Sequence, residues 1–599
     1  MPEYKAPRRD IHFLVHDVYD YPAHYQQHGF AEVTTDLINP VLEEAARFAE
    51  NVLAPTRAEG DEVGSKLVDG EVVTPPGYRK AWQALRAGQW GGISCSPAYE
   101  GQGLPHSLGM VFHEVAESAN MPFCPLMTLT QGAIRAIEAH ASDELRNLYL
   151  PRMISGDWTG TMALTEAHAG SDLGMLRTRA EPDGEGSYRV TGTKTFITWA
   201  GQDITENIVN LVLAKLPDAP AGPKGISLFL VPKYIPDADG NAGEHNNLSV
   251  AKLEDKMGLK SSPTCVFNLD GARGWLVGEP HKGLAAMFTM MNTARLDVAF
   301  EGLGISQLAF QGATEYAQDR LQMRAPDGAK YPDQAADPLI AHPDVRRMLL
   351  TQKALVEGNR ALGYFVATQL DIALGEGDEN ARAEAQALVS LFTPICKAFF
   401  TERASEITDL GIQVFGGHGY IREHGMEQLY RDVRITRIYE GTNGIQAIDL
   451  MRRKTLASER KLLDTLLARI ARFCDDHEDD ARAGGLVQRT RAATEEWSRL
   501  TDELIQRAGD DVNEPMAAAT EYLEYAGYTA LAWCWARMAV TASAKLDEPG
   551  ADRAFLDSKL ATARFYFDHI LPRATGLRES ILAGADSVME LDDEAFYIP

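Results

Sequence analysis

The sequence contains few cysteines, and none of them are grouped. Six cysteines occur in 599 residues, with no Cys-x-x-Cys pair and no group of histidines at metal-binding spacing. A structural zinc site or a disulfide framework requires such groups. We therefore expect no metal site, and we expect free, buried thiols, which are typical of a reducing compartment.

Positive charge is also scarce. Lys and Arg total 58 against 85 Asp and Glu, which gives a formal net charge of -27 at pH 7. An acidic excess of this size argues against nonspecific nucleic-acid binding and against adhesion to anionic lipid. Any anionic ligand must then be held by local cations or by backbone amides.

Long apolar runs are missing as well. The longest uncharged aromatic stretch, Tyr525 to Ala536, is too short to span a bilayer and fits a buried helix. The N-terminal sequence MPEYKAPRRD is charged from its start and shows no apolar run of the kind that secretory signals contain. We expect a cytoplasmic protein without an integral membrane segment.

What the chain does have is length and a periodic apolar pattern. With 45% hydrophobic residues, 599 residues can bury large cores and are expected to form three or four domains. Apolar residues from Leu37 to Leu53 recur at helical steps after Thr35 and Asp36, which predicts an amphipathic helix that stops at Pro55. The same period predicts helices over 82–85, 108–115, 132–139 and 145–153.

Beyond about residue 160 the period shortens and later lengthens again. Short β-branched or aromatic runs predict strands at 188–190, 195–198, 208–214, 226–231 and 265–269. Helical periodicity returns around 284–321, 343–374, 383–415 and 446–483. This order predicts an α+β chain with an N-terminal extension (1–34), a helical domain (35–160), a β-sheet domain (161–282), a helical bundle (283–455) and an additional helical domain (456–599).

One carboxylate stands out in the segment RIYEGTNGIQ, residues 437–446. Glu440 follows an apolar-aromatic stretch and precedes Gly441, where a helix or extended segment is expected to break and leave backbone amides free for a ligand. That position suits a catalytic base. The alternative is that Thr442 caps the next helix and Glu440 only supports the cap.

Two further segments carry glycines in positions that suit a cofactor. In TMALTEAHAGSD (161–172), Gly170 and Ser171 predict a tight turn whose amides and hydroxyl could bind a polar ring edge or phosphate oxygens, or else an ordinary strand-to-loop corner. In QVFGGHGY (413–420), the glycines predict either a helix C-cap or a backbone contact with a ligand. Neither segment is a strand-turn-helix nucleotide fingerprint.

Taken in order, these segments resemble the acyl-CoA dehydrogenase family. MALTEAHAGSD is similar to its first signature, GTKTFIT (192–198) to its flavin-facing strand, and QVFGGHGY with YRDVRITRIYEGTNGIQ to its second signature. The resemblance covers about residues 35–455. It implies the acyl-CoA dehydrogenase fold, with a helical N-terminal domain, a β-sheet middle domain, a C-terminal four-helix bundle, and FAD held between middle and C-terminal domains across a subunit interface.

The resemblance also assigns roles to individual residues. It makes Glu440 the catalytic base and implies that its backbone N–H polarises the thioester carbonyl. It implies FAD contacts from Met162, Leu164, Thr165, Gly170, Ser171, Phe196, Thr198, Arg320, Gln413, Gly416, Gly417, Thr442 and Asn443, and contacts near the acyl-CoA from Ser171, Asn292, Arg295 and Gly441. Arg295 could instead form a salt bridge on a helix surface.

The chain departs from the family pattern in several places. Ala167 and His168 stand where Pro-Gly is usual, and the residues after Arg320 lack the usual aromatic and glycine, which puts the adenine-end contacts in doubt. The added terminal segments resemble a subgroup of long bacterial acyl-CoA dehydrogenases that includes fatty acyl-CoA enzymes and 3-methylmercaptopropionyl-CoA dehydrogenase. A homodimer is expected.

The implied reaction is α,β-dehydrogenation of a saturated acyl-CoA, of medium or long chain in fatty acid β-oxidation, with electron-transferring flavoprotein as acceptor. The methylthio substrate is one alternative, and an acyl-CoA oxidase of the same fold is another. A flavin monooxygenase of this fold normally lacks the glutamate, so Glu440 counts against it. A noncatalytic assembly factor is the alternative of a different class. Met127 and Met290 are candidates to line an acyl pocket, or else they belong to the core.

Overall fold

The computed structural model describes residues 2–184 and 186–597, and its contacts divide the chain into two compact units. One unit runs from Glu44 to Asp297, and the other combines the residues up to Glu43 with those from Val298 onward. The division falls inside two helices, α3 (Thr35–Phe48) and α9 (Gly283–Asp319). The finer five-part division remains a prediction.

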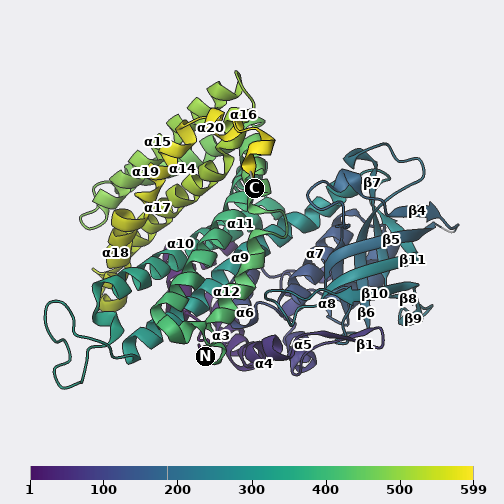
Figure 1. The fold of residues 1–599 in the computed structure, drawn as a ribbon, viewed down its shortest axis with the longest axis horizontal. Helices are drawn as coiled ribbons and strands as arrows, with labels where there is room; N and C mark the ends of the chain where they lie inside the picture. Colours follow the sequence, from purple (N-terminus) through teal and green to yellow (C-terminus); the bar gives the residue numbers. More distant parts are fainter. Residues whose placement is uncertain (1, 185, 598–599) are drawn as a thin grey trace. The chain divides into compact units, whose positions relative to one another are not determined.

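The Glu44–Asp297 unit is built on a seven-stranded sheet that closes on itself. The strand order is β10-β11-β5-β4-β6-β3, and β7 pairs with both β11 and β6, so the sheet forms a barrel (Figure 1). The pairs are antiparallel except that β6 runs parallel to β3 and β4. The strands are β3 (Trp158–Ala163), β4 (Arg179–Pro182), β5 (Ser187–Thr198), β6 (Asn207–Lys215), β7 (Ile226–Pro232), β10 (Leu248–Leu253) and β11 (Thr264–Val277), with two hairpins, β1–β2 (Lys66–Val68, Glu71–Val73) and β8–β9 (Tyr234–Pro236, Ala242–His245).

Two hydrophobic cores lie on opposite faces of this sheet, and both take residues from the continuous apolar run Leu211 to Ala214 of β6. Leu211 and Leu213 belong to one core, whereas Val212 and Ala214 belong to the other. Because successive side chains of a strand point to opposite faces, a strand buried on both sides reads as a continuous apolar run.

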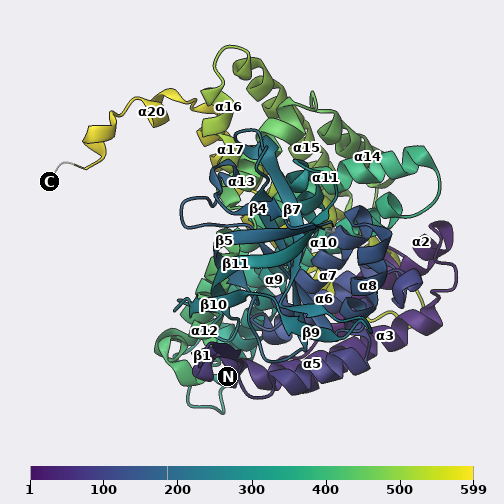
Figure 2. The ribbon, with the colours of Figure 1, turned by 90° about the vertical axis from the view of Figure 1, so that its right-hand side faces the viewer.

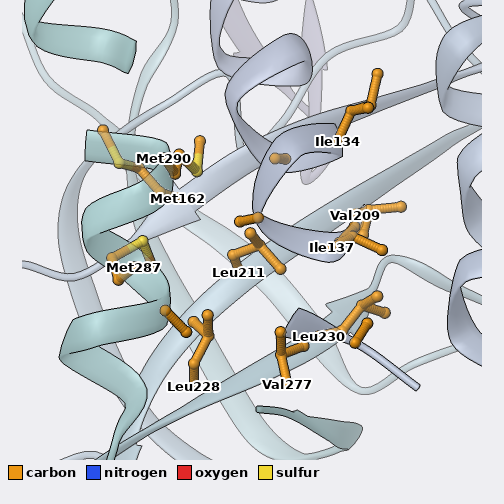
Figure 3. Close-up of a cluster of buried hydrophobic side chains, with 14 of the residues drawn as sticks. Ile134, Ile137, Met162, Val209, Leu211, Leu228, Leu230, Val277, Met287 and Met290 are labelled. Carbon is orange, nitrogen blue, oxygen red and sulfur yellow. The ribbon is translucent and has the colours of Figure 1, made fainter. Parts of the chain in front are cut away.

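Helices cover one face of the sheet, and α7 and α8 pack against β3. Figure 3 shows this core, where Ile134 and Ile137 of α7 meet strand residues and Met287 and Met290 of α9. Met290 is fully buried there, so it belongs to the core. The helices of the unit are α4 (Arg57–Val63), α5 (Tyr78–Ala87), α6 (His106–Asn120), α7 (Pro125–His140) and α8 (Asp143–Ile154).

The second unit is helical in the parts that the structure describes. The long helices α10 and α11 pack along each other, and α17 contacts both of them as well as α15, α18 and α19. In Figure 2, the segment that carries α20 extends away from α16. The helices are α1 (Arg8–His12), α2 (Tyr21–Gln27), α10 (Pro343–Leu374), α11 (Glu379–Phe415), α12 (Met426–Val433), α13 (Asn443–Ile448), α14 (Lys461–His477), α15 (Gly484–Ala508), α16 (Asn513–Ala517), α17 (Ala519–Lys545), α18 (Arg553–Phe565), α19 (Arg573–Leu582) and α20 (Asp586–Met589).

The predicted buried helix at Tyr525 to Ala536 is confirmed, because this stretch lies buried in α17. Over residues 2–184 and 186–597, no helix is both long and apolar enough to cross a membrane.

Three sequence predictions about secondary structure were wrong. Pro55 does not end the helical path, because it occupies the start of a 3-10 turn (Ala54–Thr56), where its missing N–H costs nothing, and α4 follows directly. The expected helix 446–483 is broken, because Glu459 and Arg460 adopt left-handed backbone angles, with φ of 50° and 58°. The expected strands 188–190 and 195–198 form one strand, β5, because the polar residues between them keep their ladder to β11.

The hairpin β1–β2 was missed, although the sequence carries a signal for it. Asp69 and Gly70 have φ of 51° and 86°, the left-handed pair that a two-residue hairpin turn requires. An Asp-Gly dipeptide between apolar residues is typical of such a turn.

Candidate functional site

The first signature forms a loop that follows β3. Its turn lies at Ala167 and His168, because Glu166 and Ala169 pair with each other through two backbone hydrogen bonds. Gly170 and Ser171 are exposed bends rather than the tight turn that their sequence predicts. A 2.9 Å hydrogen bond from the Thr195 N–H to the Thr165 carbonyl oxygen holds the loop to the predicted flavin-facing strand (192–198).

A buried ion pair fixes the same loop, and the sequence reasoning missed it. Lys194 is fully buried and donates to the Leu164 carbonyl oxygen at 2.9 Å and to Glu166 at 3.0 Å. Glu166 also accepts from the hydroxyl of Thr178 at 2.6 Å. Burial raises the pKa of Glu166, but the Lys194 charge and these hydrogen bonds more than reverse this effect and lower that pKa to about 2. Burial lowers the pKa of Lys194 to about 8, and Glu166 opposes that shift.

Phe196 is the most unusual residue of the flavin-facing strand. The register with β11 shifts between Cys265–Ile197 and Phe267–Lys194, so a β-bulge contains Thr195 and Phe196. Phe196 has φ of 60° and is 61% exposed, a conformation that costs about 1–3 kcal/mol for a residue with a side chain. An exposed aromatic ring in a strained backbone is expected where a flat ligand stacks on it.

We expect the substitution Phe196→Gly to separate cofactor binding from folding. Glycine adopts this backbone without strain, so the thermal midpoint of the apoprotein should stay unchanged or rise. Loss of the ring should weaken FAD binding about tenfold, which corresponds to about 1.4 kcal/mol. Thermal unfolding of the apoprotein and FAD titration measure the two effects. Asn247→Gly is the matched control, because Asn247 is also exposed with positive φ in the same unit; equal FAD affinity in both variants would contradict the assignment.

Other residues that are predicted to contact the flavin lie in the same unit. Met162 is 9% exposed in β3 and packs in the core, Leu164 is partly buried beside that core, and Thr198 accepts a 2.6 Å hydrogen bond at its carbonyl oxygen from Thr161. Met127 lines a cavity of about 500 Å³ with, among others, Trp82, Leu85 and Met153.

The predicted CoA-side residues Asn292 and Arg295 lie together on α9. The Arg295 guanidinium donates to the Asn292 side chain at 3.3 Å and lies 5.8 Å from the centre of the Phe288 ring. Arg295 is only 6% exposed, so it does not lie on the helix surface as the salt-bridge alternative assumed.

In the second unit, Glu440 lies in a sharp break between helical segments. Glu440 and Gly441 have φ of 54° and 85°, so both adopt left-handed backbone conformations and the chain breaks here as predicted; the left-handed conformation of Glu440 itself was not predicted. Thr442 caps α13 by accepting from the Ile445 N–H at 3.2 Å. The cap alternative is therefore confirmed for Thr442, whose own hydroxyl makes the cap, and Glu440 is half-buried beside it.

Asn443 is engaged inside the protein. Its side chain donates to Thr401 and Glu402, each at 3.0 Å, and accepts from the buried ammonium of Lys397 at 3.0 Å. A flavin contact from Asn443 would therefore have to use its backbone. The sequence did not point to Lys397 or Gln446. Lys397 donates a hydrogen bond to the Gly441 carbonyl oxygen, and Gln446 donates one to the Glu440 carbonyl oxygen.

The glycine segment follows α11 directly. Gly416 has φ of 59° and ends the helix, so the C-cap alternative is confirmed. A Cβ added at Gly416 or Gly417 would meet nothing within 4 Å, and both glycines and Gln413 are exposed, so there is space for a ligand beside them; the Gly416 N–H itself donates to the Gln413 carbonyl oxygen. Arg320 follows the end of α9 and is exposed.

The residues present fit FAD. The exposed Phe196 ring suits a flavin, and the free space beside Gly416 and Gly417 and the exposed Arg320 guanidinium suit a diphosphate. The structure describes these groups in separate units, and their roles remain predictions. Among residues 2–184 and 186–597, no group of His, Cys, Asp and Glu is placed to hold a metal ion.

Comparison with known families gives consecutive matches along the chain. The acyl-CoA dehydrogenase N-terminal domain matches residues 38–157, its middle domain 161–272 and its C-terminal domain 281–455. A further family, described as acetyl-CoA dehydrogenase C-terminal like, matches residues 466–592.

Individual proteins are similar over the whole length. The chain is 41% identical to 3-methylmercaptopropionyl-CoA dehydrogenase of Ruegeria pomeroyi over 98% of this chain and 99% of that protein. It is 32% identical to a broad-specificity linear acyl-CoA dehydrogenase of Mycobacterium tuberculosis, which covers 100% of both. The crystal structure of an acyl-CoA dehydrogenase complexed with FAD from Bacillus anthracis shares the fold, with a TM-score of 0.74 and 19% identity over 94% of this chain and 90% of that one.

Proposed function

The chain belongs to the acyl-CoA dehydrogenase family and is an FAD-dependent oxidoreductase, and from this premise we propose that it converts a saturated acyl-CoA into the trans-2-enoyl-CoA with Glu440 as base. The observation that carries the proposal is the left-handed break at Glu440 and Gly441 within the matched C-terminal domain. A backbone held in this conformation turns sharply at a helix break and fixes the direction of the glutamate side chain and of its own N–H.

Different residues have different roles in the proposed reaction. Glu440 takes the α-proton as general base, and its backbone N–H donates to the thioester carbonyl oxygen as enolate character develops. FAD, when bound, supplies the hydride acceptor for the β-hydrogen that no protein side chain provides. Phe196 and the first signature loop, fixed by Lys194 and Glu166, would hold the flavin ring.

We propose 3-methylmercaptopropionyl-CoA as a substrate. The Ruegeria relative, at 41% identity over nearly the full length, supports it over the medium- or long-chain alternative. Straight-chain fatty acyl-CoA remains the second candidate, because the Mycobacterium relative is a broad-specificity linear acyl-CoA dehydrogenase.

A screen of flavin bleaching tests both the reaction and the substrate. We expect anaerobic mixing of purified holoenzyme with 3-methylmercaptopropionyl-CoA to bleach the flavin with a second-order rate constant at least about tenfold above that for octanoyl-CoA, the discrimination that differences of a few methylenes provide. Faster bleaching with octanoyl-CoA would assign the fatty acyl alternative. Failure of every acyl-CoA to bleach bound FAD would leave only the noncatalytic role.

The electron acceptor is proposed to be electron-transferring flavoprotein. Reoxidation of the substrate-reduced enzyme by that flavoprotein, with slow reaction with oxygen, supports a dehydrogenase, whereas rapid reaction with oxygen would make the chain an acyl-CoA oxidase. A homodimer in the cytoplasm completes the proposal. All six cysteines, each within the described residues, are free thiols, which suits a reducing compartment.

A further inference from the structure

Two buried side chains donate hydrogen bonds to the turn that carries Glu440. The Lys397 ammonium, on α11, donates to the Gly441 carbonyl oxygen at 2.7 Å. The Gln446 amide, on α13, donates to the Glu440 carbonyl oxygen at 3.2 Å and to that of Gly441 at 3.4 Å. Both carbonyls of the left-handed pair therefore accept hydrogen bonds from side chains that are fully buried.

A buried lysine is an unfavourable choice if its role is only to fill space. Burial of an ammonium disfavours its charged form, and a methionine would fill the same length without that cost. What the ammonium adds is a charge-assisted hydrogen bond, which is shorter and stronger than a neutral one. Lys397 uses it on the residue after Glu440 and on Asn443, so a single cation ties the break to the start of α13.

These hydrogen bonds are needed because the backbone conformation is unfavourable for glutamate. A residue with a side chain resists positive φ, and Glu440 has φ of 54°. Without the donors, the turn would relax toward a right-handed conformation. That change would redirect both the Glu440 carboxylate and its N–H, the two groups that the proposed reaction uses.

We propose that Lys397 is a positioning residue for the dehydrogenation, with Gln446 as its partner, and that together they hold Glu440 in its reactive orientation. This inference rests on the proposed function of Glu440. Lys397 acts on the backbone of the turn and does not itself take the proton.

The variant Lys397→Met tests the proposal in the holoenzyme by stopped-flow flavin reduction with the best substrate of the screen. We expect the maximal rate of flavin reduction to fall about 10- to 100-fold, the effect of a misplacement near 1 Å, while the acyl-CoA concentration at half-maximal rate and the FAD content change less than about threefold. A rate within about threefold of wild type would overturn the proposal. A loss of rate that only follows a loss of FAD would also overturn it, because that result describes a structural residue.

Hydrogen exchange in the apoprotein gives a readout that does not depend on turnover. Amides of the peptide spanning residues 437–446 should exchange faster in Lys397→Met, whereas peptides of the barrel should not change. Unchanged exchange in that peptide would count against the proposal. If none of the acyl-CoAs reduces the flavin of the wild-type protein, the proposed function fails. The exchange experiment then still decides whether Lys397 orders the turn.

Lys559→Met is the matched control, because Lys559 is equally buried but pairs with Asp10 and Glu357 instead of this turn. Measured below its unfolding transition, it should keep the wild-type rate per bound FAD, and an equal loss of rate in both variants would overturn a specific role for Lys397. If Lys397→Met does not fold, Gln446→Met carries the test. It should lower the rate in the same direction without loss of FAD, and a wild-type rate would overturn the proposal.

Discussion

Replacing Glu440 with glutamine is expected to lower the rate of flavin reduction by acyl-CoA about 10²- to 10⁴-fold, the contribution of a general base. Glutamine keeps the size of the side chain but cannot take the α-proton at neutral pH. FAD content and acyl-CoA binding should stay near those of wild type, because the change removes no aromatic surface and no backbone donor. Stopped-flow absorbance under anaerobic conditions measures the rate, and equilibrium titration measures binding.

Glu379→Gln provides the control for this substitution. Glu379 is an exposed glutamate in the first turn of α11, and its replacement should leave the rate of flavin reduction unchanged. Turnover of Glu440→Gln at the wild-type rate would sink the assignment of the base. A loss of FAD in parallel with activity would instead show that Glu440 supports the fold of the site.

Replacing Asp10 with alanine is expected to lower the free energy of unfolding by about 3–5 kcal/mol, the cost of removing one partner from a buried ion pair. Asp10, on α1, contacts the ammonium of Lys559 and the guanidinium of Arg360. Lys559, on α18, also contacts Glu357 at 2.8 Å. The cluster thus joins the N-terminal segment, α10 and the C-terminal helices, so these parts should lose stability together in urea and thermal unfolding.

The pair of Arg8 and Glu43, 3.2 Å apart and only partly buried, supplies the contrast. Glu43→Ala should cost only about 0–1 kcal/mol, because water screens exposed charges. An equally small effect of Asp10→Ala would show that the cluster does not stabilise the fold.

Acid sensitivity gives an independent check on Asp10. Burial raises the pKa of this carboxyl, but the charges of Lys559 and Arg360 outweigh that effect and lower it from 3.8 to about 2. A carboxylate with a lowered folded-state pKa contributes stability that is complete above its unfolded pKa and is lost as pH falls toward its folded pKa. Wild type should therefore lose stability between about pH 4 and pH 2 more steeply than Asp10→Asn. Parallel curves for both proteins would contradict the pairing.

Helix prediction from sequence succeeded where local pattern and packing agree. The predicted segment 343–374 coincides with α10. Pro343 at its start and Gly375 after its end are residues typical of helix termini. The strands of the barrel were harder to predict, because β4 and β10 are short, partly exposed and depend on neighbours distant in sequence.

Of the candidate site, the sequence predicted the local backbone features but not the contacts between residues distant in the chain. Glycine positions and the break at Glu440 are local properties, and the backbone angles there confirm the predicted break. The roles of Lys194 and Lys397 could not be read locally, because each lysine acts on residues 28 or more positions away. For Lys397 the signal was a lone lysine among apolar residues of a helix, whereas Lys194 stands between two threonines and gives no such signal.

The sequence by itself determined the family, the order of helices and sheet, and the residue expected to act as base. Short motifs and hydrophobic periods are local, and they persist in the chain whether or not it is folded. Only the tertiary structure decided that Phe196 stands exposed on a strained bulge and that buried lysines hold the signature loop and the Glu440 turn. These features depend on long-range burial and hydrogen bonding, which a linear pattern does not specify.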